Sequence, residues 1–331
     1  MKSKMFSTFV LFFLLSFVFF SGCDNGLTDN GLTDNVAPID PPYANIPDVN
    51  SYRAIFVGES HDNREIYNVY PRLMRYYYSL GVRDFAFELG YGSVLLVQHY
   101  IDTGNEECLQ VLFRNLKGSM AYNQEYFYFF KELHKWNSSL KDKIKLHSFD
   151  VEHQFESARA AMWFIVFKKY KRIDGIPAIS VPGNSRDLVM DFKNNRSRYS
   201  SLSPEDIILL ERIILSVEQS INYYDNRSSP SVSDSMREQY MIDNFREIIR
   251  NTENRKVFAT MGWNHASLNG QGDGASRGYS MASILKSEIS IGSIVLRQQA
   301  DPNRWQYTIW INENLKTTPF NSTYAGNWPY D

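Results

Sequence analysis

The sequence has few cysteines, no surplus of charge of one sign and no long apolar run beyond its first twenty residues. Its two cysteines are too few to build a disulfide framework. The 35 basic and 37 acidic residues give a net charge of −2, so we expect no basic face and no nucleic-acid partner. With 43% hydrophobic and 22% charged residues among 331, the composition excludes a disordered, collagen-like or polytopic membrane protein and indicates a globular one.

The first 22 residues have the pattern of a secretory signal peptide. Lys2 and Lys4 precede an apolar run over residues 5–20, which is shorter than the roughly 20 apolar residues that a membrane span needs. Cys23 follows Ser21 and Gly22, an arrangement that resembles the bacterial lipoprotein signal, in which this cysteine is lipidated. We therefore expect a protein of the cell envelope that a lipid anchors to the membrane, facing the periplasm or the cell exterior. The alternative is an ordinary secretion signal with an incidental cysteine.

Residues 23–50 are expected to form a flexible tether between this anchor and a folded domain of residues 51–331. The tether contains a tandem pentapeptide, Asn-Gly-Leu-Thr-Asp, at 25–29 and 30–34, followed by four prolines. Asn-Gly and Asp-Asn steps favour turns, and the segment has almost nothing to bury. We interpret it as a spacer and not as a site.

Short apolar runs alternate with helical patterns through the folded part, which is typical of βα units and a largely parallel sheet. Strands are expected at 53–58, 82–87, 144–151, 255–261, 290–297 and 305–312, and helices at 66–77, 93–101, 123–136 and 279–288. Pro71 is expected to kink or split the first helix. The mainly helical stretch 155–252, with a well-capped helix start at Ser203-Pro204, is expected to form an inserted lobe. The prediction is an α/β fold with a central mixed, mostly parallel sheet flanked by helices.

Histidines and carboxylates follow the predicted strands at their carboxyl ends. These residues are Glu59 and His61 after the first strand, Glu88 after the second, Asp150, Glu152 and His153 after the third, and His265 after the fourth. Each alone has an ordinary structural explanation, such as a helix cap, a loop histidine or an ion pair. Because the carboxyl ends of parallel strands lie along one edge, where open α/β folds place ligands, the set together predicts a functional site there.

The order of these motifs resembles the erythromycin esterase-like proteins over residues 55–297. The resemblance rests on the segments Gly58-Glu59-Ser60-His61-Asp62-Asn63, Phe87-Glu88, Tyr100 to Gly104, Phe149-Asp150, Arg237-x3-Met241-x2-Asn244, Gly262-x2-His265 and Ser280-Met281-x2-Ile284-Leu285. One departure is that the esterases carry two residues between the glutamate and the histidine, whereas here only Ser60 intervenes. The Gly-Glu-x-His-Asp-Asn form is closer to the haem-binding lipoproteins of the ChaN family, and the Tiki-type metalloproteases belong to the same broad superfamily.

The resemblance implies a hydrolytic site that needs no cofactor and acts on a small-molecule ester or other acyl substrate. His61 would be the base that activates water, Glu88 would orient or polarise it, and His265 would be a second essential histidine. A histidine titrates near neutral pH, and a carboxylate partner supports its charged form. The supporting or substrate-binding residues would be Glu59, Arg64, Asp150, Glu152, Arg237 and Asn244. The helical face that carries Arg237 is otherwise apolar, so its charge also predicts an ion pair with a core carboxylate.

Other site chemistries remain open at the level of the sequence. Glu59, His61, Glu88 and His265 could supply a mixed set of ligands for a divalent metal, although no tightly spaced ligand pair occurs. The alternatives are a haem- or iron-binding lipoprotein without catalysis and a metal-dependent peptidase. Residues 274–278 match the Gly-x-Ser-x-Gly pattern of the serine-hydrolase nucleophile elbow. This motif needs a strand that leads directly into it, and none is expected here, so we interpret the match at Ser276 as coincidental.

Overall fold

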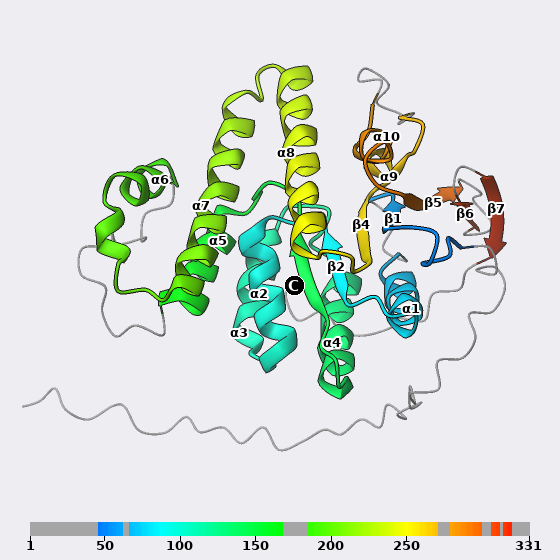
Figure 1. The fold of residues 1–331 in the computed structure, drawn as a ribbon, viewed down its shortest axis with the longest axis horizontal. Helices are drawn as coiled ribbons and strands as arrows, with labels where there is room; N and C mark the ends of the chain where they lie inside the picture. Colours follow the sequence, from blue (N-terminus) through cyan, green and yellow to red (C-terminus); the bar gives the residue numbers. More distant parts are fainter. Residues whose placement is uncertain are drawn as a thin grey trace, which may run out of the picture. The chain divides into compact units, whose positions relative to one another are not determined.

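A computed structural model describes residues 46–61, 66–167, 185–270 and 279–296, and the backbone of 297–299, 306–311 and 314–319. Its strands form one seven-stranded sheet in the order β3-β2-β4-β1-β5-β6-β7 (Figure 1). The first five strands in that order are parallel, and β6 and β7 are antiparallel additions. The bounds are β1 Ala54–Glu59, β2 Asp84–Phe87, β3 Lys145–Ser148, β4 Val257–Gly262, β5 Ile291–Gln299, β6 Gln306–Ile311 and β7 Asn314–Pro319. The predicted mixed, mostly parallel sheet is confirmed.

Alternating side chains of the central strands enter two separate apolar cores, as the period of two in a strand requires. Ile55 and Val57 of β1 belong to the core of one face, and Ala54 and Phe56 belong to the core of the other. The first core packs against α1 Ile66–Ser79, α2 Tyr91–Thr103, α3 Glu106–Leu116 and α4 Gln124–Ser139. The second packs against α8 Pro230–Asn251, α9 Trp263–Ala266 and α10 Met281–Leu285. The sheet is therefore buried on both faces, which leaves its carboxyl edge for a site.

The described part of the chain between β3 and β4 is mainly helical, as predicted for 155–252. Its elements are α5 Phe155–Ala161, the π-helix η2 Met162–Val166, α6 Ser185–Asn194, the 3-10 helix η4 Arg196–Tyr199, α7 Pro204–Asp225 and α8. The predicted cap of α7 is confirmed, because the Ser203 side chain accepts a hydrogen bond from the Asp206 N–H and Pro204 occupies the first turn. Within the described ranges, no helix is long and apolar enough to cross a bilayer.

The structure differs from the expected elements in several places. α1 continues through Pro71 as one helix, because its apolar face, which includes Leu73 and Tyr77, is packed into the core and outweighs the missing hydrogen bond. α3 and β7 were not predicted, and the helix expected over 279–288 spans only Met281–Leu285. The signal peptide, most of the tether, Cys23, Arg64 and Ser276 lie outside the described residues.

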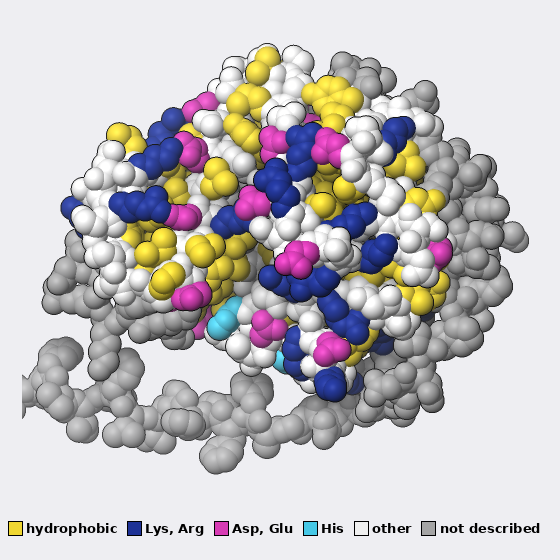
Figure 2. Space-filling view, in the orientation of Figure 1, with side chains coloured by type: hydrophobic (Ala, Val, Ile, Leu, Met, Phe, Trp, Pro, Cys, Tyr) yellow, Lys and Arg dark blue, Asp and Glu magenta, His cyan; other side chains and the backbone are white. Residues whose placement is uncertain are grey.

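The pairing register of the strands places their carboxyl ends, and the polar residues that follow them, side by side along the sheet. Glu59 of β1 pairs with Gly262 of β4, and Phe87 of β2 pairs with both Thr260 and Ser148 of its neighbours. The four strands β3, β2, β4 and β1 therefore end in a row, so the residues that follow them share one edge. On the face that Figure 2 presents, acidic and basic side chains are interspersed, in keeping with the near-balanced charge of the sequence.

Candidate active site

A cavity of about 640 Å³ opens at the carboxyl ends of the parallel strands. Its polar lining comes from Glu59, His61, Glu88, Asp150, His153 and Arg237. The aromatic side chains on its wall come from the helices and from β2, namely Tyr67, Tyr70, Phe87, Tyr126, Tyr223 and Tyr224. Charged groups that surround a water-accessible space lined with apolar rings are the usual composition of a small-molecule site.

His61 and Glu59 form a hydrogen-bonded pair on the cavity wall. Nδ1 of His61 lies 2.7 Å from Oε1 of Glu59, and the imidazole is 44% exposed while the carboxylate is buried. This hydrogen bond, with a further contribution from the nearby Glu88 charge, raises the pKa of His61 to about 9. The carboxylate that hydrogen-bonds His61 in this structure is therefore Glu59, whereas Glu88 acts on His61 through its charge.

Gly262 packs directly against the His61 ring. A methyl group placed on Gly262 would lie 2.9 Å from Nε2 of His61 and 3.5 Å from Oε2 of Glu88. The Gly262 N–H donates a hydrogen bond to the same Oε2, at 2.5 Å. The absence of a side chain at this position thus lets the ring of His61 and the carboxylate of Glu88 face the same part of the cavity.

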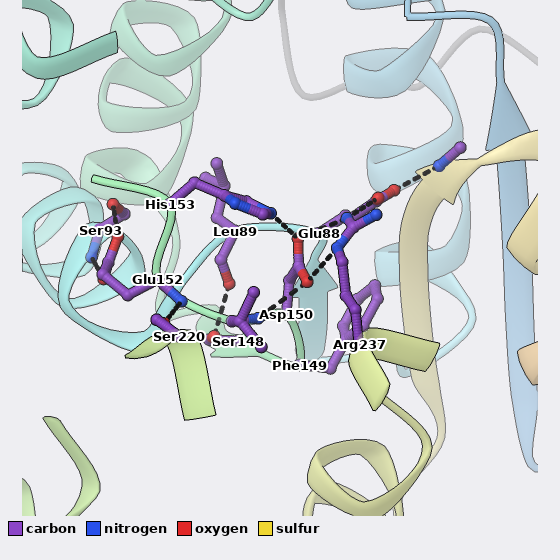
Figure 3. Close-up of polar contacts among 12 residues, drawn as sticks. Glu88, Leu89, Ser93, Ser148, Phe149, Asp150, Glu152, His153, Ser220 and Arg237 are labelled. Atoms are coloured by element: carbon purple, nitrogen blue, oxygen red, sulfur yellow. Dashed lines mark hydrogen bonds and ion pairs between the residues drawn. The ribbon is translucent and has the colours of Figure 1, made fainter. Parts of the chain in front are cut away.

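Glu88, Arg237 and Asp150 form a buried ion-pair cluster between the strand ends (Figure 3). Arg237 of α8 donates from Nη2 to Glu88 at 2.5 Å, and from Nε and Nη2 to the two oxygens of Asp150 at 2.8 and 2.6 Å. Burial opposes ionisation of Asp150, but Arg237 and His153 hold the pKa of this carboxyl well below its ordinary value. The predicted pairing of Arg237 with core carboxylates is confirmed.

His265 lies behind Glu88 and does not line the cavity. Its Nε2 is 3.5 Å from Oε1 of Glu88, and its Nδ1 is 2.6 Å from Oε2 of Glu238. Burial lowers the pKa of His265, but the two carboxylates outweigh burial and raise it above its ordinary value. Glu88 in turn has a lowered pKa, because the charges of His265, Arg237 and His61 overcome its burial. His265 thus acts on the site through its contact with Glu88.

Two of the expected supporting residues have structural roles. Glu152 is buried and accepts hydrogen bonds from the N–H and hydroxyl of Ser93, at 3.1 and 2.8 Å. Ser93 is in the first turn of α2, whose N-cap Gly90 has no side chain, so Glu152 caps this helix from outside it. Burial raises the pKa of Glu152 to about 7. Asn244 donates to the carbonyl of Phe149 at 3.2 Å and so ties α8 to the end of β3.

The four candidate metal ligands do not fit a metal ion in this arrangement. Glu88 already accepts hydrogen bonds from Arg237 and Gly262, Glu59 is bound to His61, and His265 faces Glu238. A guanidinium 2.5 Å from a carboxylate occupies the position that a cation would take. Across the described ranges, no group of three or more His, Cys, Asp or Glu side chains is placed to hold a metal.

Sequence reasoning missed Glu238 and the aromatic wall of the cavity. Glu238 lies in the buried stripe of α8, three residues before Met241 and seven before Phe245, so a carboxylate within an apolar helical stripe was the available signal. The tyrosines come from α1, α4 and α7, and no local pattern distinguishes a tyrosine of the core from one at a cavity.

Comparison with known structures shows which proteins share this fold. No protein-family model matches the sequence, and no curated protein matches it either. A succinoglycan biosynthesis protein aligns with a TM-score of 0.53 and 16% identity over 82% of this chain and 72% of its own. A Bacillus cereus protein aligns with a TM-score of 0.51 and 17% identity over 87% of this chain and 74% of its own. The chain thus has an α/β fold that also occurs in other proteins of known structure.

A mutant of the erythromycin esterase EreC, in its open conformation, aligns with a TM-score of 0.51 and 14% identity over 83% of this chain and 78% of its own. The chain therefore has the erythromycin esterase-like fold, as the resemblance implied. Identities this low show the fold alone. A structure of ChaN from Campylobacter jejuni with haem bound aligns at a TM-score of only 0.31, which says nothing about haem binding here.

Proposed function

We propose that this protein is a hydrolase that cleaves an ester or another acyl compound, with His61 as the general base. The observation that carries the proposal is the Glu59–His61 pair, 2.7 Å apart, on the wall of a cavity that also exposes Glu88 and Arg237. A histidine held by a carboxylate beside a guanidinium is a combination that can activate water and stabilise an oxyanion.

Glu59 binds Nδ1 of His61 and so leaves Nε2 to take a proton from water. The water oxygen then bonds to the acyl carbon, the proton moves to Nε2, and the tetrahedral intermediate expels the leaving group. Only neutral His61 can accept this proton. With a pKa of about 9, the neutral fraction at pH 7 is roughly one in a hundred, and it grows about tenfold for each pH unit up to 9.

Arg237 supplies the group that stabilises the developing oxyanion. Its Nε and Nη2 are engaged by Asp150 and Glu88, whereas no described residue accepts a hydrogen bond from Nη1. Arg237 lines the cavity, and its charged state is secure because the adjacent carboxylates raise its pKa further. Its remaining N–H groups can therefore meet the substrate carbonyl oxygen without reorganisation of the ion-pair cluster.

The hydrolysis of p-nitrophenyl butyrate by the purified protein tests this function. His61→Ala should lose at least about 100-fold in turnover, the lower range of general-base catalysis, while the protein stays folded. The matched control is His99→Ala, because His99 is on α2 and does not line the cavity. Equal activity of wild type and His61→Ala would refute the proposal.

We propose further that the mature chain is held at a membrane of the cell envelope by lipidated Cys23, with the domain facing the periplasm or the exterior. The competing function is haem or iron binding without catalysis. A haemin titration of the same purified sample separates the two, since a saturable Soret shift without any ester hydrolysis would favour the haem-binding protein.

A further inference from the structure

A second set of hydrogen-bonded side chains lies on the cavity wall, and the hydrolytic step described above does not use it. Nε2 of His153 is 3.2 Å from Oδ2 of Asp150, and Nδ1 of His153 is 2.8 Å from the hydroxyl of Tyr224. All three residues line the cavity. Figure 3 shows the His153 ring directed at Asp150, on the side of that carboxylate away from Arg237.

Tyr224 is held so that its hydroxyl remains at the cavity. Its ring packs against Tyr223, with the ring centres 4.9 Å apart, and against Phe155 at 5.9 Å, and the guanidinium of Arg227 covers it at 5.6 Å. Burial raises the pKa of Tyr224, so the phenol keeps its proton and is a donor at neutral pH.

The two histidines stand at opposite ends of the row of strands. His61 follows β1 and His153 follows β3, and the strands between them are β4 and β2. Three strand spacings of about 4.8 Å separate the ends of β1 and β3 by about 14 Å, so side chains that follow them and reach inward leave room for one ester between them. A group that takes a proton from water at one end cannot also deliver one to a leaving group at the other.

We propose that Tyr224 is the general acid of this site, and that Asp150 and His153 form the relay that supplies its proton. The inference rests on the proposed hydrolase function. When the carbon–oxygen bond to the leaving group breaks, the departing oxygen takes the Tyr224 proton. The phenol oxygen then takes a proton from Nδ1 of His153, and Nε2 of His153 stays hydrogen-bonded to Asp150.

Solvent then returns a proton to His153, which is 28% exposed, and His61 releases the proton that it took from water. The sum of the steps is one ester and one water converted to one acid and one alcohol. The substrate class that follows is an ester of an aliphatic alcohol, because only a strongly basic leaving oxygen needs such an acid.

Two esters with the same acyl group and leaving groups of similar size test this role. p-Nitrophenolate leaves without a proton, whereas the alkoxide of benzyl butyrate needs one. Tyr224→Phe should therefore lose about 100-fold in kcat on benzyl butyrate and less than about threefold on p-nitrophenyl butyrate. His153→Asn should show the same dependence on the leaving group. Tyr76→Phe is the matched control, because Tyr76 is on α1 and does not line the cavity, and it should match wild type on both esters.

The outcomes separate the two proposals. Equal losses on both esters, or no loss on benzyl butyrate, would make Tyr224 a structural residue and overturn the relay while leaving the hydrolase intact. If wild type hydrolyses neither ester, the proposed function fails and the relay fails with it. Hydrolysis of p-nitrophenyl butyrate that needs His61 but is indifferent to Tyr224, with benzyl butyrate sensitive to both, would support the two together.

Discussion

Gly262→Ala should disable the site without unfolding the protein. The backbone at Gly262 has φ −57° and ψ 140°, which alanine adopts without strain. The new Cβ would nevertheless lie 2.9 Å from Nε2 and 3.1 Å from Cε1 of His61, closer than such atoms approach. Because the His61 side chain is 44% exposed, its ring can rotate away, and that rotation breaks the 2.7 Å contact with Glu59.

The effect on stability should be small and the effect on activity large. Replacing glycine by alanine in a permitted conformation gains about 0.4–1 kcal/mol through the unfolded chain, and losing a partly exposed ion pair costs about 0–1 kcal/mol. At pH 10, where His61 is neutral and this ion pair no longer contributes, the free energy of unfolding should therefore change by less than about 1 kcal/mol. Turnover of p-nitrophenyl butyrate should fall by about 100-fold, because the base is no longer oriented.

The assays are urea denaturation, ester hydrolysis and an NMR titration of His61. Without Glu59, the pKa of His61 should fall from about 9 toward its ordinary value near 6.5. Gly81→Ala is the control, since Gly81 has φ 95° and no neighbour within 4 Å of a new Cβ. It should lose stability and keep activity. A Gly262→Ala protein with a His61 pKa near 9 and full activity would refute the reasoning.

Three further perturbations have defined outcomes. Glu88→Gln removes the charge between Arg237 and His265, so urea denaturation should show a loss of about 3 kcal/mol; a loss below about 0.5 kcal/mol would contradict the buried ion-pair cluster. Burial raises the pKa of Glu152 from 4.5 to about 7, so ionisation destabilises the native state as pH rises through that window. Glu152→Gln should therefore match wild type in free energy of unfolding near pH 4 and exceed it at pH 8, by at most about 3 kcal/mol. An identical pH dependence of stability in the two proteins would argue against a raised pKa of Glu152. Cys23→Ala should release the protein from membranes or block its processing, and a variant that fractionates with membranes at the normal mature mass would exclude the lipid anchor.

The positions of the site residues along the sheet could be predicted from the sequence, because they depend only on the direction in which the parallel strands run. Parallel strands must end on one edge, so Glu59, Glu88 and Asp150 had to lie in one row once the strands were recognised. The cap at Ser203 was predictable for a similar reason, since its hydrogen bond is local.

The choice of partners could not be predicted in the same way. Which carboxylate binds His61, and whether His265 reaches the cavity or stops behind Glu88, depend on side-chain rotamers set by residues distant in sequence. Glu238 reaches His265 from α8, and a hydrogen bond of 2.5 Å from the Met281 N–H of α10 holds it there. α3 is a different case, because its signals were present: Asn105 caps it and two acidic residues occupy its first turn.

The pH dependence of kcat/KM for p-nitrophenyl butyrate, measured on wild type and His61→Ala, tests the central claim most directly. If neutral His61 activates water, the wild-type value should rise about tenfold per pH unit and level off near pH 9, where His61 has lost its proton. His61→Ala should be at least about 100-fold less active at pH 9 and should lack that titration. A wild-type rate that is flat with pH or falls through pH 9, or an unchanged profile in His61→Ala, would contradict the assignment of His61 as the base.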